Sequence, residues 1–244
     1  MPGEKNNMDN KIEHDYLNLV EFWNQNFALS DADKKAIKES LPTDDDLKSL
    51  APSQKLFDVL SIFKGNDCVL DYGCGSGWAS IILAKNGVNN VTAADVAPLS
   101  IEMTKCYAEA FKVRDKISAV CIDSNWIRKQ QGEIFDGFYC SNVIDVVPFE
   151  MAKDIIKHSA RVVRKGSLVV FSLNYYIDPL EMEKRGATID GKSIYINGVL
   201  RLLSLKDEEW LERFKEYYDI IELDYFAWPG EAKETRRIFV LKKR

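Results

Sequence analysis

The fold is decided by residues 69–77, which read Val69-Leu70-Asp71-Tyr72-Gly73-Cys74-Gly75-Ser76-Gly77. The first half is typical of a short buried strand, the glycine-rich half predicts a tight turn, and residues 78–85 have the pattern of a helix. Glycine lets a ligand approach the backbone without a Cβ in the way, and the helix that follows directs free N–H groups at the same point. This order of elements predicts a ligand site at one edge of an α/β sheet.

The same alternation of strand and helix continues towards the C-terminus. Further strands are predicted at residues 91–95, 117–122, 135–140, 167–173, 220–226 and 237–241, the last of them antiparallel. The strand at residues 167–173 is apolar nearly throughout, and such unbroken apolar strands between helices predict a parallel sheet covered by helices on both faces. Between residues 174 and 204 two hairpin dipeptides, Asp190-Gly191 and Asn197-Gly198, predict a small β-meander.

The N-terminal region has a helical pattern instead. Residues 16–27 place apolar side chains at spacings of three and four, which predicts an amphipathic helix. Further helices are expected over residues 31–40 and 52–60, with a solvated acidic turn at Asp44 to Asp46 between them.

Acidic residues end the second and third predicted strands, beside the glycine turn. Asp95 is placed to accept hydrogen bonds from ribose hydroxyls, and Asp123 to accept one from the exocyclic amine of a base. Ser80 stands where the nicotinamide fingerprint requires glycine, and Asp71 would repel a pyrophosphate. The pattern favours a nucleoside with a zwitterionic tail.

These residues resemble the first motif of the class I S-adenosylmethionine-dependent methyltransferases, with Asp95 as their ribose-binding acid and Asp123-Ser124 as their adenine-binding pair. Residues 135–148 resemble the fourth motif of the small-molecule (methyltransferase-11/25-like) branch, and residues 163–168 its turn into strand five. The resemblance implies a Rossmann-like, seven-stranded mixed sheet of order 3-2-1-4-5-7-6, with strand seven antiparallel and helices on both faces. It divides the chain into an N-terminal helical lid (1–60) and an S-adenosylmethionine-binding domain (61–244), with the insertion 174–204 capping the acceptor site.

The resemblance also implies roles for individual residues. The expected cofactor-binding residues are Tyr16, Asp71, Gly73, Gly75, Gly77, Asp95, Val96, Asp123, Ser124, Cys140 and Asn142. Residues of the lid and the insertion are candidates for binding the acceptor, namely Trp23, Asn174, Tyr175, Tyr176, Tyr195 and Arg201. No general base stands out; His14 and Asp145 are weak candidates, and His158 a weaker one.

The expected function is transfer of a methyl group from S-adenosylmethionine to a small-molecule acceptor by direct in-line displacement. Two alternatives stay open, a nicotinamide-dependent Rossmann oxidoreductase and a non-catalytic cofactor-binding module. The net charge of −5 argues against a nucleic-acid partner.

The remaining expectations concern metal, membrane and compartment. The five cysteines form no Cys-x-x-Cys pair, so no metal site is expected. No apolar run approaches the roughly 20 residues that cross a bilayer, and no signal peptide is evident, so no membrane partner and a cytoplasmic location are expected. The sequence leaves the oligomeric state open.

Overall fold

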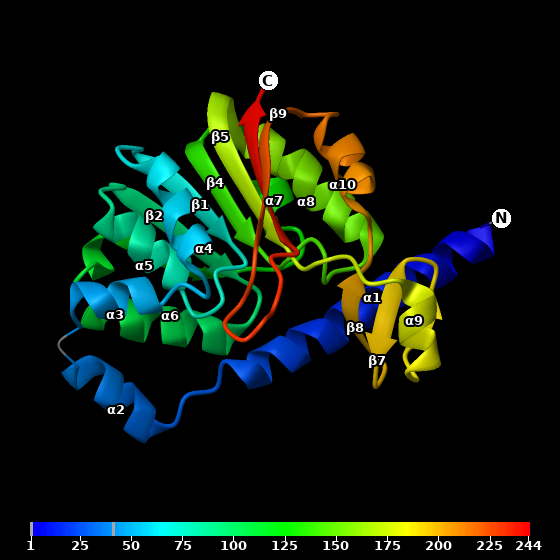
Figure 1. Cartoon of the computed structure of the whole chain (residues 1–244), viewed down its shortest axis with the longest axis horizontal. Helices are drawn as coiled ribbons and strands as arrows, with labels where there is room; N and C mark the ends of the chain where they lie inside the picture. Colours follow the sequence, from blue (N-terminus) through cyan, green and yellow to red (C-terminus); the bar gives the residue numbers. More distant parts are fainter. Residues whose placement is uncertain (1, 41) are drawn as a thin grey trace.

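The computed structural model describes residues 2–40 and 42–244, with side chains from residue 10 onward. A seven-stranded mixed sheet forms its centre, in the order β3-β2-β1-β4-β5-β10-β9 (Figure 1). The strands are β1 (Cys68–Tyr72), β2 (Asn90–Asp95), β3 (Ile117–Cys121), β4 (Phe135–Ser141), β5 (Val163–Leu173), β9 (Tyr218–Phe226) and β10 (Arg236–Lys243). The first five are parallel, whereas β10 runs antiparallel to both β5 and β9. Strands β6 to β8 belong to the insertion, so β9 and β10 are the sixth and seventh strands of this sheet. The order is therefore the predicted 3-2-1-4-5-7-6, and the predicted fold is confirmed.

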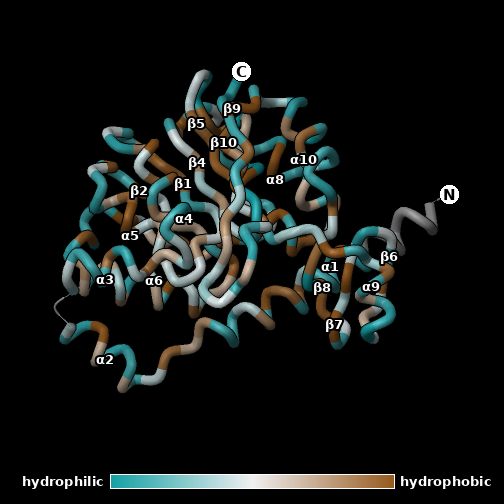
Figure 2. Tube along the Cα trace, in the orientation of Figure 1, coloured by the Kyte–Doolittle hydropathy of each residue, from teal (hydrophilic) through white to brown (hydrophobic). Residues whose placement is uncertain are grey.

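Helices cover both faces of the sheet, as the apolar strands require. One face packs against α4 (Gln54–Val59), α5 (Trp78–Lys85) and α6 (Pro98–Ala110), with the short 3-10 turns Leu60–Phe63 and Arg114–Lys116 nearby. The other face packs against α7 (Trp126–Lys129), α8 (Phe149–Val162) and α10 (Asp207–Phe214). The trace through the central strands is largely hydrophobic, and the outer loops are hydrophilic (Figure 2). Each face therefore has its own buried core.

The N-terminal segment contains α1 (Pro2–Asn26), α2 (Asp31–Glu39) and α3 (Asp44–Ser49). Helix α1 begins well before the predicted start at residue 16, because the apolar stripe covers only its second half. The predicted turn at residues 44–46 is wrong. Thr43 and Asp46 form a reciprocal capping box, in which the Thr43 hydroxyl accepts from the Asp46 amide, and this starts α3. Helix α1 runs along the lower edge of the sheet in Figure 1.

The insertion after β5 contains α9 (Pro179–Lys184) and a separate antiparallel sheet of β6 (Thr188–Asp190), β7 (Ser193–Ile196) and β8 (Val199–Leu203). The predicted β-meander is therefore confirmed, whereas α9 was not predicted. The meander lies beside α1 (Figure 1), which β8 contacts. Among the described residues, no helix is both long enough and apolar enough to span a membrane.

Candidate functional site

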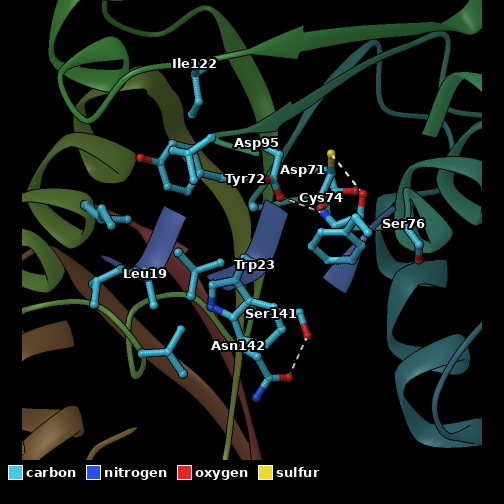
Figure 3. A pocket seen from close by; sticks show the side chains of 18 of the residues that line it. Leu19, Trp23, Asp71, Tyr72, Cys74, Ser76, Asp95, Ile122, Ser141 and Asn142 are labelled. Atoms are coloured by element: carbon cyan, nitrogen blue, oxygen red, sulfur yellow. Dashed lines mark hydrogen bonds between the residues drawn. The ribbon is translucent and has the colours of Figure 1, made fainter. Parts of the chain in front are cut away.

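A cavity of about 270 Å³ lies where β1, β2 and β4 end (Figure 3). Its wall is built from the glycine turn after β1, the residues that follow β2, β3 and β4, the start of α8, and the second half of α1. The carboxyl edge of an open parallel sheet is where ligands of such folds bind. The cavity is therefore the candidate site.

The glycine turn is held by bonds within the protein. The Gly73 amide donates to the Ala94 carbonyl at 2.7 Å, and the Gly75 amide donates to an Asp95 carboxylate oxygen at 2.9 Å. Gly73 has φ of 76°, and a Cβ there would lie 2.1 Å from Val143 Cγ2. Gly73 and Gly75 line the cavity, whereas Gly77 does not and packs against Thr104. The turn is therefore packed tightly within the protein, and the amides of Gly73 and Gly75 are already engaged.

Asp71 lies at the floor of the site and is 2% exposed. The Ser80 hydroxyl at the start of α5 donates to its carboxylate at 2.5 Å. Burial raises the pKa of Asp71 to about 7, opposed by the hydrogen bond from Ser80. A cation beside Asp71 would stabilise the charged form of this buried carboxylate, because it supplies the electrostatic interaction that water no longer provides.

Asp95 ends β2 and faces the cavity. One carboxylate oxygen accepts from the Gly75 amide and the other from the Ala97 amide, each at 2.9 Å. Burial raises the pKa of Asp95, while these backbone donors lower it. Each oxygen retains a lone pair, so two further donors, such as vicinal hydroxyls, fit here. Val96 lines the cavity next to it.

At the end of β3, Ser124 lines the cavity but Asp123 does not. Asp123 is exposed, and Lys129 donates to its carboxylate at 2.9 Å, which lowers the pKa of Asp123. Tyr16 of α1 also lines this side, and burial together with the charge of Asp123 raises the pKa of Tyr16. The phenol of Tyr16 is thus kept neutral at the junction between α1 and the end of β3.

At the end of β4, Asn142 and Ser141 line the cavity beside Trp23 (Figure 3). The Ser141 hydroxyl bonds the Ser172 hydroxyl at 2.7 Å and the Asn142 side-chain oxygen at 3.3 Å. The Asn142 side-chain nitrogen is buried and has no hydrogen-bond partner in the part of the chain that the structure describes. A buried unpaired donor costs about 1–3 kcal/mol, so a ligand oxygen at this point would be stabilising. Cys140 is fully buried and does not line the cavity.

The rest of the wall is apolar. Leu19 and Trp23 contribute from α1, Val146 and Val147 follow β4, and Met151 belongs to α8. Trp23 had been predicted for the site. This side of the cavity accommodates an apolar ligand group.

Two further wall residues were not predicted for the site. Phe27, just after α1, lies against Gly75, where a Cβ would be 3.2 Å from its ring. Trp228 comes from the loop between β9 and β10, and the Arg236 guanidinium stacks on its ring at 3.5 Å. The stripe containing Trp23 points to Phe27 too, whereas no sequence pattern points to Trp228.

Five predicted acceptor-binding residues do not line the cavity; they are Asn174, Tyr175, Tyr176, Tyr195 and Arg201. The Asn174 side chain donates to Asp145 at 2.9 Å, and the cations of Arg236 and Lys206 lie over the rings of Tyr175 and Tyr176, respectively.

Tyr195 and Arg201 connect the insertion to α1. The Tyr195 hydroxyl donates to the buried Asp15 carboxylate at 2.8 Å, and Arg201 stacks on Phe22 at 4.2 Å. Lys11 of α1 also pairs with Asp190 of the insertion. Through these contacts the insertion holds α1, the helix that covers the cavity, in place.

The candidate bases lie away from the cavity. The His14 side chain is 72% exposed and bonds Asn18. Asp145 is fully buried, and its carboxylate accepts the Asn174 amide at 2.6 Å. His158 bonds Arg161, and burial lowers the pKa of His158. A catalytic role for any of them stays a prediction.

Part of the chain is similar in sequence to known methyltransferases. Residues 69–166 match the family described as "Methyltransferase domain". The ubiquinone biosynthesis O-methyltransferase of Idiomarina loihiensis is 32% identical over 104 residues, which cover 43% of this chain and 41% of that protein. The ribosomal protein L11 methyltransferase of Pseudoalteromonas atlantica is 24% identical over 136 residues, or 51% of this chain and 44% of that protein. The chain thus matches less than half the length of these relatives.

A solved structure extends the likeness over most of the chain. The N-methyltransferase NodS of Bradyrhizobium japonicum, in complex with S-adenosylhomocysteine, has a TM-score of 0.58 at 16% identity, covering 86% of this chain and 97% of NodS. This likeness concerns the fold. Residues 69–166 therefore match a methyltransferase domain, and the chain has the fold of the class I S-adenosylmethionine-dependent methyltransferases, as the motif after β1 predicted.

Proposed function

We propose that this protein transfers a methyl group from S-adenosylmethionine to a small molecule. The main support is the cavity, which joins a carboxylate-lined side to an apolar side beneath α1. Asp95 retains lone pairs for two donors, and the buried side-chain nitrogen of Asn142 needs an acceptor. These features fit an adenosyl amino acid.

In this proposal, Asp95 holds the ribose and Val96 and Ser124 lie beside the adenine. Asp71 binds the ammonium group of the methionine tail, whose positive charge stabilises this buried carboxylate. The S-adenosylmethionine supplies an already activated methyl group, so the protein's contribution is alignment. Holding a nucleophile in line with the methyl group contributes up to roughly 7–11 kcal/mol.

The acceptor is proposed to bind on the apolar side, against Trp23 and Met151. Helix α1 covers this side and the insertion clamps α1, so the acceptor reaches a confined space. A confined apolar space suits a small molecule better than a folded protein. A protein acceptor is the second candidate, because residues of this chain match ribosomal protein L11 methyltransferases.

The test is transfer of labelled methyl groups from S-adenosylmethionine into a cell extract divided by ultrafiltration. We expect label in the low-molecular-weight fraction with the wild-type protein and none with Asp95→Ala. Label confined to protein would instead favour the second candidate. A wild-type protein that binds S-adenosylhomocysteine but labels neither fraction would contradict methyl transfer and favour a non-catalytic module.

A further inference from the structure

Tyr139 of β4 is a buried polar group that the proposed roles leave unexplained. Its side chain has no exposed surface, yet it lines the cavity. Among the described residues, its hydroxyl has no hydrogen-bond partner of good geometry; the nearby Ser141 and Ser172 hydroxyls bond each other at 2.7 Å. A buried hydroxyl without a partner destabilises the free protein, so its presence points to a ligand atom.

The position of Tyr139 relates it to Asp71. The two residues are direct neighbours in the parallel pairing of β1 with β4, so both side chains project to the same face of the sheet. Adjacent strands lie about 4.8 Å apart. The α5 face of the site thus combines one buried carboxylate with one neighbouring hydroxyl donor. Tyr139 and Trp78 pack there in a T-shaped arrangement, with ring centroids 5.7 Å apart.

The Tyr139 hydroxyl is protonated and can therefore donate a hydrogen bond. Burial raises the pKa of Tyr139 far above its ordinary value, so the phenol keeps its proton at any physiological pH. A neutral phenol beside a carboxylate complements a zwitterion whose ammonium and carboxylate groups are attached to one carbon atom. The glycine turn supplies little for such a carboxylate, because the amides of Gly73 and Gly75 are engaged within the protein.

We propose that the Tyr139 hydroxyl binds the carboxylate of the methionine tail, next to the ammonium group at Asp71. This inference rests on the proposed function and adds a residue to it. Tyr139 thereby discriminates ligands with a complete amino-acid tail from those without the carboxylate.

The test is isothermal titration calorimetry with S-adenosylmethionine and with decarboxylated S-adenosylmethionine, which differ only in the carboxylate. Tyr139→Phe is expected to lower the affinity for S-adenosylmethionine about tenfold or more, equivalent to about 1.4 kcal/mol. The affinity for the decarboxylated compound should change less than about twofold. The free variant should melt no lower than the wild type, because the substitution removes an unpaired buried hydroxyl.

Tyr218→Phe is the matched control. Tyr218 is also fully buried, but it lies outside the cavity and its hydroxyl bonds Ser159 at 2.7 Å. This variant should lose thermal stability and keep both affinities.

Three outcomes contradict the proposal in different ways. If Tyr139→Phe lowers the affinity for both ligands equally, or for neither, the role of Tyr139 is overturned. Binding of S-adenosylmethionine by the wild-type protein would still support the proposed cofactor. Failure of the wild-type protein to bind S-adenosylmethionine overturns the proposed function together with this inference.

Discussion

Substitution of Gly73 tests whether the turn after β1 has the tight packing on which the site depends. Gly73→Ala introduces two costs. An L-residue at φ of 76° loses roughly 1–2 kcal/mol relative to glycine. The new Cβ would also lie 2.1 Å from Val143 Cγ2, and relief of such overpacking costs typically about 1–3 kcal/mol. We therefore expect the free energy of unfolding to fall by about 2–5 kcal/mol.

Gly198→Ala separates the two costs. Gly198 has nearly the same φ, 78°, but no atom of the described residues lies within 4 Å of a Cβ built there. This control should lose only about 1–2 kcal/mol in urea unfolding followed by circular dichroism. Adding Val143→Ala to Gly73→Ala should recover part of the excess, because it removes the clashing methyl group. Equal losses for Gly73→Ala and Gly198→Ala, or no coupling with Val143, would refute this description of the turn.

Two further predictions concern charge and the cover of the cavity. Because the pKa of Asp71 is raised to about 7, the folded state binds an extra proton between about pH 4 and 7, and the free energy of unfolding should fall as the pH rises through this range. The affinity for an ammonium ligand should increase as the pH rises from about 6 to 8, because Asp71 becomes charged. Asp71→Asn should remove both pH dependences, measured by urea titration and by calorimetry. Tyr195→Phe should speed hydrogen exchange in the second half of α1 about tenfold, because the hydroxyl no longer bonds Asp15; unchanged exchange would show that the insertion does not hold α1.

The features predicted correctly from sequence depend on neighbours along the chain. Apolar runs between helices define the strands, and the glycines after Tyr72 define the turn, because backbone conformation and burial leave a local pattern. The position of Asp95 followed from the topology, since parallel strands end at the same edge of the sheet. Trp23 was predicted from the family resemblance, which implies that the N-terminal helix covers the site, and it does line the cavity.

The features that sequence could not predict depend on contacts between distant segments. Trp228 reaches the cavity from the far end of the sheet, held by Arg236, and no local pattern records that contact. The hairpin of the insertion was predicted, but the partners of Tyr195 and Arg201 were not, because a strand pattern does not specify what packs against it. Both residues hold α1 and do not line the cavity.

The central claim is that the cavity binds S-adenosylmethionine by its ribose and its amino-acid tail. The most direct measurement is a crystal structure of the protein with S-adenosylhomocysteine. We expect both ribose hydroxyls within hydrogen-bond distance of Asp95, the adenine between Val96 and Ser124, and the tail at Asp71 and Tyr139. A ligand bound elsewhere, or in the reverse direction with its adenine at Asp71, would contradict the account.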